Sequence, residues 1–445
     1  MEPTSNPSSL DQPKTGRATK AKRRNISIAL AILAVIAIGI AAFVATSGDN
    51  KSAKSGAYTS GDPLVWTAVA GQGSGTCALV NSGKVKCWGR NDYGQLGNGT
   101  SNIYKNTAVF VSDIPTTTGA TATSISSGLY HSCALLSDRQ VTCWGLNDSG
   151  QLGNDSADLK SLTPVPVSGI STATAISTGT EHSCALLSDG QVKCWGRNDW
   201  GQLGNENNIP SNVPVFVSGI PTTTGATAIG ISTGKRHSCA LLSDGQVKCW
   251  GRNIEGQLGD GSYADSKNTA VLVSGIPAVT GGPTAIGIST GAGHSCAVLS
   301  DGQIKCWGLN DYGQLGDGTG NNMKRTAVLV SGIPATTGGP TAISISTGAQ
   351  HSCAVLSDGQ VKCWGYNYYG QLGNASKTQS LVPVLVSGIP ATPGGPTATS
   401  ISTGTEHSCA LLSDGQVTCW GLNGRGQLGN VTSDNSITPV LVPNP

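Results

Sequence analysis

The feature that most constrains the fold is a unit repeated seven times, marked by pairs of cysteines. Nine residues separate the two cysteines of each pair, and successive pairs begin 56, 51, 55, 57, 57 and 56 residues apart. This period is in the range of propeller blades and exceeds that of leucine-rich or ankyrin repeats. Because such units cannot bury their apolar faces alone, we expect one cooperative domain despite the length of 445 residues.

One unit carries four short segments with the composition of β-strands. Residues 213–217 are β-branched and aromatic, residues 227–233 alternate, and residues 237–242 and 246–251 flank a Ser-Asp-Gly turn. Gly-rich and Pro-rich turns separate the segments, and no apolar period of 3.6 residues is present. We therefore predict an all-β fold, a seven-bladed β-propeller of four-stranded antiparallel blades.

The turn between the third and fourth segments predicts how the cysteines pair. With a three-residue turn at 188–190, Cys184 faces Cys194 within disulfide range. A zinc site is the alternative, since His182 lies on the same strand face, but Gly75 replaces this histidine in the first copy while both cysteines remain. We expect seven disulfides, one within each blade: Cys77–Cys87, Cys133–Cys143, Cys184–Cys194, Cys239–Cys249, Cys296–Cys306, Cys353–Cys363 and Cys409–Cys419.

The two ends of the repeat region suggest how the ring closes. The first copy begins at residues 63–69, which match a second strand, and the chain finishes with residues 437–442, which match a first strand. We predict that the C-terminal strand completes the first blade, which would hide the sheet edges.

The N-terminal region predicts a membrane anchor. Residues 26–45 hold no charge and are long enough for a transmembrane helix, and residues 1–25 form a basic tail that should stay cytoplasmic. Residues 46–62 are predicted to be a flexible linker to a propeller at 63–445. A cleaved signal peptide is the alternative. Either reading places the propeller on the extracytoplasmic side of the cell membrane, where disulfides persist.

The charge distribution bears on the choice of partner. Six basic against two acidic residues give the first 24 residues a net charge of +4, which leaves about −2 for the rest of the chain. With 12% charged residues, the body has no basic footprint for nucleic acid.

Two recurring segments resemble a known repeat. Asp-Gly-Gln-Val-Lys-Cys-Trp-Gly and Asn-Asp-Tyr-Gly-Gln-Leu-Gly are similar to the repeat of the regulator of chromosome condensation family, which implies a seven-bladed propeller. The family includes a nuclear guanine nucleotide exchange factor and secreted bacterial β-lactamase inhibitor proteins, so the resemblance does not settle activity. The apolar segment and the paired cysteines depart from the nuclear member and favour a membrane-anchored, bacterial-type member over an exchange factor.

Catalytic and metal-binding patterns do not stand out from the repeat. All six histidines occupy one repeat position, so they are dispersed around the ring and interpreted as structural. The dipeptides at 260–261 and 317–318 lack the alternating ligands of a calcium loop. We expect no metal, no cofactor and no catalysis; an extracytoplasmic hydrolase or lyase, with Glu255 or Asp265 as the nearest candidates, is kept as an alternative.

Variation among the copies points to a binding surface. The residues before each histidine, the residue before each Gly-Gln-Leu-Gly and the loop that follows should emerge on one face of the ring, and they differ from copy to copy. Tyr, Trp and Arg often dominate binding interfaces, so we predict recognition of an extracytoplasmic protein or surface ligand by a monomeric body. A structural module without a partner is the other reading. The predicted binding residues are Tyr93, Tyr104, Tyr130, Trp200, Arg236, Glu255, Tyr263, Tyr312, Arg325, Tyr369 and Arg425.

Overall fold

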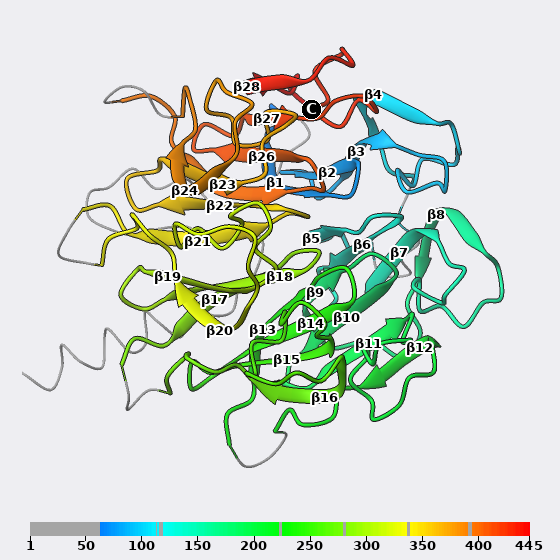
Figure 1. Cartoon of the computed structure of the whole chain (residues 1–445). Helices are drawn as coiled ribbons and strands as arrows, with labels where there is room; N and C mark the ends of the chain where they lie inside the picture. The colour runs from blue at the N-terminus through cyan, green and yellow to red at the C-terminus, as the bar shows by residue number, and fades with distance from the viewer. Residues whose placement is uncertain are drawn as a thin grey trace, which may run out of the picture. The chain divides into compact units, whose positions relative to one another are not determined.

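The computed structural model describes residues 63–112, 114, 119–221, 225–278, 282–335, 339–389 and 394–445. Within these ranges the 28 regular elements are all strands, and they form seven four-stranded sheets, which confirms the predicted propeller (Figure 1). The predicted transmembrane helix, basic tail and linker lie outside the described residues. Among the residues that are described, no helix is long and apolar enough to cross a membrane.

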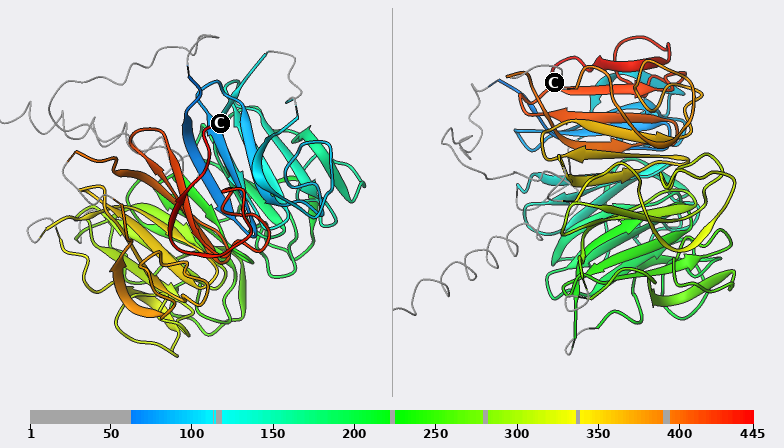
Figure 2. Two further views of the ribbon diagram at one scale, coloured as in Figure 1. Left: turned by 90° about the horizontal axis from the view of Figure 1, so that it is seen from above. Right: turned by 60° about the vertical axis from the view of Figure 1, so that its left-hand side comes forward.

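Each blade consists of four consecutive strands, ordered from the innermost to the outermost. The first strands of neighbouring blades contact one another and therefore line the centre of the ring. The first and last blades lie side by side (Figure 2). The first strands are β1(Trp66–Gln72), β5(Ala122–Ser127), β9(Ala173–Thr178), β13(Ala228–Thr233), β17(Ala285–Thr290), β21(Ala342–Thr347) and β25(Ala398–Thr403). The second strands are β2(Gly75–Val80), β6(His131–Leu136), β10(His182–Leu187), β14(His237–Leu242), β18(His294–Leu299), β22(His351–Leu356) and β26(His407–Leu412).

The outer half of each blade continues the same antiparallel order. The third strands are β3(Val85–Arg90), β7(Val141–Leu146), β11(Val192–Gly196), β15(Val247–Arg252), β19(Ile304–Gly308), β23(Val361–Gly365) and β27(Val417–Gly421). The outermost strands are β4(Tyr104–Phe110), β8(Lys160–Pro166), β12(Ser211–Phe216), β16(Ser266–Leu272), β20(Lys324–Leu329), β24(Ser380–Leu385) and β28(Ser436–Leu441). The second strands are buried along their length, whereas the outermost strands are partly exposed.

The hairpin of the second and third strands has the predicted register. Cys184 pairs with Cys194 across β10 and β11, and Gly190 supplies the positive φ, 80°, that the turn requires. The seven predicted disulfides are all present, with Cα–Cα distances of 4.0 to 4.1 Å. Each bridge therefore fixes a pairing that the strand register already sets.

The predicted closure of the ring is wrong. β28 pairs with β27 of its own blade, Cys419 opposite Val440, and the first blade is completed by β4. The segment that was interpreted as the first strand of a blade is the outermost strand of the blade before it. The physical reason lies in the preceding loop: the side-chain amide of Asn423 donates to the backbone oxygen of Thr432, 3.1 Å away, which folds the chain back onto its own sheet.

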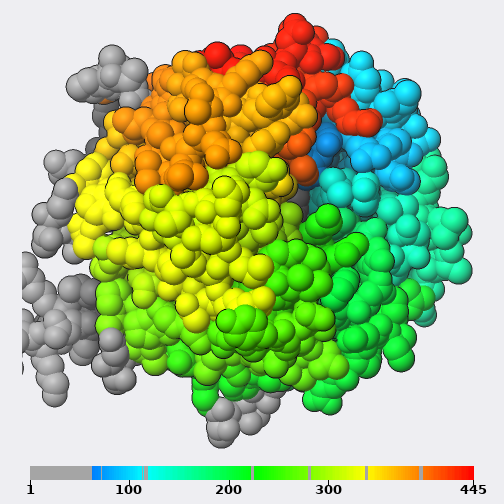
Figure 3. Space-filling view, viewed as in Figure 1, coloured from blue at the N-terminus to red at the C-terminus, as the bar shows by residue number. Residues whose placement is uncertain are grey.

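Side chains close the ring in place of a shared sheet. Nε1 of Trp88 in the first blade donates to the backbone oxygen of Gln427 in the last, at 2.9 Å, and Oγ1 of Thr76 lies 2.9 Å from Nε2 of His407. Trp66 and Trp88 of the first blade also pack in one apolar cluster with residues of the last blade, and the two blades lie in contact (Figure 3). The contacts are of the same kind as those between consecutive blades.

The apolar core lies between blades. Trp195 of the third blade is fully buried among Leu and Val side chains of the second, and its Nε1 donates to the backbone oxygen of Gln151 at 2.9 Å. Gly153, with φ of +66°, seats this ring: a Cβ there would lie 2.7 Å from Trp195. Every blade is thus stabilised by a tryptophan from its neighbour: Trp88, Trp144, Trp195, Trp250, Trp307, Trp364 and Trp420.

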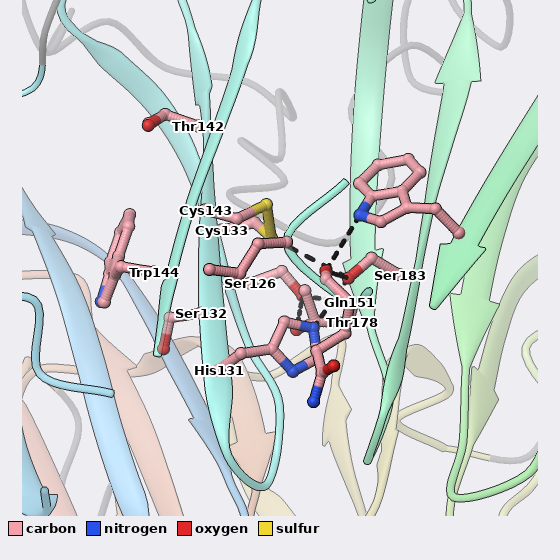
Figure 4. Close-up of a disulfide and its surroundings, with 12 residues drawn as sticks. Ser126, His131, Ser132, Cys133, Thr142, Cys143, Trp144, Gln151, Thr178 and Ser183 are labelled. Carbon is pink, nitrogen blue, oxygen red and sulfur yellow. Dashed lines mark hydrogen bonds between the residues drawn. A yellow bond between two sulfur atoms is a disulfide. The ribbon is translucent and has the colours of Figure 1, made fainter. Parts of the chain in front are cut away.

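Six histidines cross the same seams. Nε2 of His131 lies 2.7 Å from Oγ of Ser183 in the next blade, and Oγ of Ser126 lies 2.9 Å from Oγ1 of Thr178 (Figure 4). Each of the other histidines makes the equivalent contact to a serine, or in His407 to a threonine. The histidines therefore join neighbouring blades, in agreement with their structural interpretation.

Candidate functional site

The variable segments emerge at one face of the ring. In the third blade, the turn at 179–181 joins the first two strands and the loop at 197–210 joins the last two, so antiparallel order places both at the same end of the sheet. The backbone nitrogen of Arg197 donates to the oxygen of Glu181 at 2.8 Å, which holds the two segments together. We call the equivalent turns and loops of all blades the variable face.

Each long loop presents one residue on a rigid support. The backbone nitrogen of Trp200 donates to Oε1 of Gln202 at 2.9 Å, and Oδ1 of buried Asn198 accepts from the backbone nitrogen of Leu203. The same pair of bonds recurs in every blade, so the loop core is constant while the presented residue changes. We call this residue the display position: Tyr93, Ser149, Trp200, Glu255, Tyr312, Tyr369 and Arg425.

A second variable residue follows each Cys-Trp-Gly and lies at the junction between blades. We call it the seam position: Arg90, Leu146, Arg197, Arg252, Leu309, Tyr366 and Leu422. Sequence reasoning overlooked this set. The sequence does carry a signal for it, because this residue differs between copies while the glycine before it and the asparagine after it are the same in all seven.

The first and second blades join through an arginine between two tyrosines. The rings of Tyr93 and Tyr130 are 5.3 Å apart, and the guanidinium of Arg90 lies 5.4 and 5.2 Å from their centroids. Arg90 also forms an ion pair with Asp92 at 2.6 Å. This hydrogen-bonded carboxylate raises the pKa of Arg90 above its usual value. These two predicted binding residues are half-buried beneath a cation from the chain itself.

The same arrangement continues across the fourth blade. Arg252 lies 5.5 Å from the ring of Trp200 and pairs with the carboxylate of Glu255 at 2.6 Å. The guanidinium of Arg325 lies 4.4 Å from the ring of Tyr263, which is 84% exposed. Three predicted binding residues, Trp200, Tyr263 and Arg325, therefore lie in two cation–aromatic pairs, and a fourth, Glu255, is paired with Arg252.

Four tyrosines gather between the fifth and sixth blades. Ring centroids are 4.8 Å apart for Tyr312 and Tyr366, 6.5 Å for Tyr366 and Tyr369, and 5.0 Å for Tyr368 and Tyr369. Tyr368 is 64% exposed. We call these four residues the tyrosine cluster. It brings together two predicted residues, Tyr312 and Tyr369, and adds Tyr366 and Tyr368, which sequence reasoning missed.

Three predicted residues stand apart from these groups. Tyr104 begins β4 and is 41% exposed, and Arg425 is exposed at the display position of the last blade. The backbone oxygen of Arg236 accepts from the nitrogen of Arg252 at 2.9 Å, and its side chain is half-buried. A surface hollow of about 520 Å³ lies beside Arg197 and Ser149 on the same face.

The histidines that join neighbouring blades are neutral at neutral pH. Burial lowers the pKa of the histidines to about 3, and of His407 to about 4, so they are uncharged at neutral pH. Among the described residues no group of three or more His, Cys, Asp or Glu is placed to hold a metal ion. Asp265 accepts from the nitrogen of Asn253 through its backbone oxygen at 2.6 Å.

Comparison with known families decides the assignment. The profile of the RCC1-like domain matches residues 115–445, and that of the regulator of chromosome condensation (RCC1) repeat matches residues 82–135. The chain belongs to the RCC1-like domain family. The resemblance expected from the repeat is confirmed.

Similar proteins of this family differ in size and role. The chain is 33% identical to the ultraviolet-B receptor UVR8 of Arabidopsis thaliana over 320 residues, 72% of this chain and 69% of that protein. It is 30% identical to the E3 ubiquitin-protein ligase HERC2 of Homo sapiens over 77% of this chain, which spans only 7% of the ligase. The RCC1-like propeller is therefore shared by proteins with unlike names and activities.

Solved structures agree on the fold. Human WBSCR16 superposes with a TM-score of 0.69 at 23% identity, over 81% of this chain and 93% of that one. Yeast RCC1 (Prp20), bound to Kap60, gives 0.68 at 21% identity, over 90% and 91%. At these identities the likeness establishes the propeller alone.

Proposed function

We propose that this RCC1-like propeller is a membrane-anchored protein exposed outside the cytoplasm that recognises a protein partner through its variable face, without catalysis. The observation that carries the proposal is the set of Tyr, Trp and Arg side chains that rigid loops present on one face. Aromatic and arginine side chains, held in place before binding, lose little conformational entropy when a partner docks.

The proposed location rests on the disulfides and the N-terminal segment. Seven disulfides and the absence of a free cysteine among the described residues suit an oxidising compartment. Residues 26–45 supply the apolar length that a single membrane span needs. Labelling of intact cells with a membrane-impermeant reagent should reach the propeller; protection from that reagent would contradict the proposed orientation.

The binding role is tested with paired variants of the full chain. Trp200, Tyr312 and Tyr369 change to Ala in one variant, and Phe110, Phe216 and Leu272 change to Ala in the control. The control residues end outermost strands at the opposite face and are 45 to 53% exposed, so both variants remove three large side chains.

Each variant and the unaltered chain would be extracted from membranes and used to capture partners. We expect a partner retained by the unaltered chain and by the control but lost from the variable-face variant, while the melting temperatures of the two variants fall by similar, small amounts. Identical capture by all three chains would favour the structural-module alternative. Loss of capture by the control variant alone would indicate that the partner binds the opposite face, which carries Phe110, Phe216 and Leu272.

A further inference from the structure

At two junctions between blades, an arginine of the chain itself lies over the aromatic rings of the variable face. At the seam position, Arg90 stacks over Tyr93 and Tyr130, and Arg252 stacks over Trp200. Arg197, at the same position of the third blade, pairs with the carboxylate of Glu181 at 2.7 Å. An arginine at the seam position therefore contacts either the ring at a display position or a residue of the turn before the histidine.

The sixth blade carries a tyrosine where the first, third and fourth blades carry this arginine. Tyr366 occupies its seam position and joins Tyr312, Tyr368 and Tyr369 in the tyrosine cluster. Within the described ranges no Lys or Arg lies over any of these four rings. The negative π-faces of several tyrosines are thus brought together without the cation that accompanies such rings elsewhere in the molecule.

A carboxylate beside the cluster lacks its partner for a parallel reason. Glu406 lies directly before His407 in the seventh blade, as Glu181 lies directly before His182 in the third. Glu181 pairs with Arg197, but the seventh blade has Leu422 at the position of Arg197 and so provides no partner there. The Glu406 side chain is half-buried, and no ion pair of the described chain involves it. Burial raises the pKa of Glu406. Glu406 holds in the seventh blade the position that Tyr130 holds in the second, where it contacts the seam residue Arg90 of the blade before it; Tyr366 is the corresponding seam residue of the sixth blade. Burial also raises the pKa of Tyr366, with smaller contributions from Tyr369 and Glu406.

We propose that the tyrosine cluster and Glu406 form a binding site for the guanidinium of an arginine side chain from the partner protein. The inference rests on the proposed binding function and names the group that this part of the variable face recognises. The planar guanidinium can stack on a ring while its N–H groups donate to a carboxylate, as Arg90 does with Tyr130 and Asp92. A lysine ammonium offers no planar face to stack on a ring, so an arginine suits these tyrosines better.

A titration that needs no knowledge of the partner tests the site. The probe is a capped Gly-Arg-Gly peptide, added to the full chain in detergent micelles and followed by the ring signals of ¹³C-labelled tyrosines. The chain holds nine tyrosines, so the four of the cluster can be followed among few signals. The neutral citrulline peptide is the matched control, and lysine peptide and tetramethylammonium report on other cations.

We expect the arginine peptide to shift the signals of Tyr366, Tyr368 and Tyr369, and the lysine peptide to bind about tenfold more weakly. Citrulline binding as strong as arginine binding would overturn the proposal, because it would show that the charge is not recognised. Tighter binding of lysine or tetramethylammonium would overturn the assignment to a guanidinium.

Two variants separate the site from general loop structure. Tyr366→Arg gives the sixth blade an arginine at the seam position, where the first blade has Arg90. This variant should not bind the peptide and should keep its thermal stability. Glu406→Gln keeps the shape but removes the charge and should weaken binding about tenfold. Tyr366→Phe, which keeps the ring, should still bind. Unchanged binding by both Tyr366→Arg and Glu406→Gln would overturn the proposal.

Failure here can be told apart from failure of the binding function. If Tyr366→Arg captures the partner as the unaltered chain does, while Trp200→Ala, which leaves the tyrosine cluster intact, loses it, the variable face binds without this site. If neither change affects capture, the proposed function fails as well.

Discussion

The buried seams and the variable face arise from the same repeat, but they use its positions in opposite ways. In the seams, a tryptophan, a histidine and a glutamine backbone oxygen make nearly the same hydrogen bonds from blade to blade. On the variable face, equivalent positions hold Arg, Leu or Tyr and make different contacts at each junction. Constant side chains therefore maintain the ring, and changed ones are free to recognise a partner.

Acid should test the seams most severely. The buried histidines have a pKa near 3 in the folded chain and about 6.5 when unfolded, so the unfolded state binds more protons between these values. Stability is complete above pH 6.5 and falls by about 1.4 kcal/mol per histidine for each pH unit below it. Urea unfolding of the oxidised chain from pH 8 to 4 would show the loss.

The first change that sharpens this result is His182→Gln, which removes one of the six titrating groups. Unfolding of this variant should take up as much as one proton fewer, so its free energy of unfolding should depend less steeply on pH. A stability that stays level from pH 7 to pH 4 would contradict the neutral, buried histidines.

Removing a seam tryptophan should have the next largest effect. Trp195→Ala leaves a cavity against the second blade and removes one of the two hydrogen bonds to the backbone oxygen of Gln151, which keeps the bond from Ser183, at a cost of about 3–5 kcal/mol. Denaturant unfolding measures it, with Trp200→Ala as the control for loss of a tryptophan from the variable face. Equal losses for the two variants would remove the distinction between the two regions.

Loss of one disulfide should cost less. The bridge Cys184–Cys194 closes a short hairpin whose strands are already paired, so replacing both residues by Ala should lower stability by at most about 3 kcal/mol. The melting temperature of the double variant provides the measurement. An unfolded product would mean that the hairpin register depends on the bridge.

The smallest effect is expected for the aromatic residues of the variable face. Trp200 is half-buried beneath Arg252, so Trp200→Ala should cost about 0.5–1 kcal/mol through the lost cation–aromatic contact. Partner capture should change far more than the melting temperature. A stability loss above about 3 kcal/mol would show that Trp200 supports the fold as the buried tryptophans between the blades do.

Much of the fold follows from local sequence. The Ser-Asp-Gly turn and the alternation around it specify the hairpin, the hairpin specifies which cysteines pair, and the period specifies seven blades. The same reasoning recovered the face that carries the loops, because antiparallel order alternates the ends of a sheet. The hairpin and the disulfides depend on residues within about a dozen positions of one another, and the number of blades follows from the period of the repeat.

The tertiary structure decided what meets across the blades. It assigned β28 to the last blade, paired His131 with Ser183, and brought Tyr312 next to Tyr366. The pairing of Cys419 with Val440 spans 21 positions within one blade, whereas His131–Ser183 and Tyr312–Tyr366 span 52 and 54 positions and depend on how one blade packs on the next. The sequence by itself determined the hairpins, the disulfides and the number of blades; only packing could decide the closure of the ring and the grouping of the tyrosines, because no local pattern encodes the distance between side chains on different sheets.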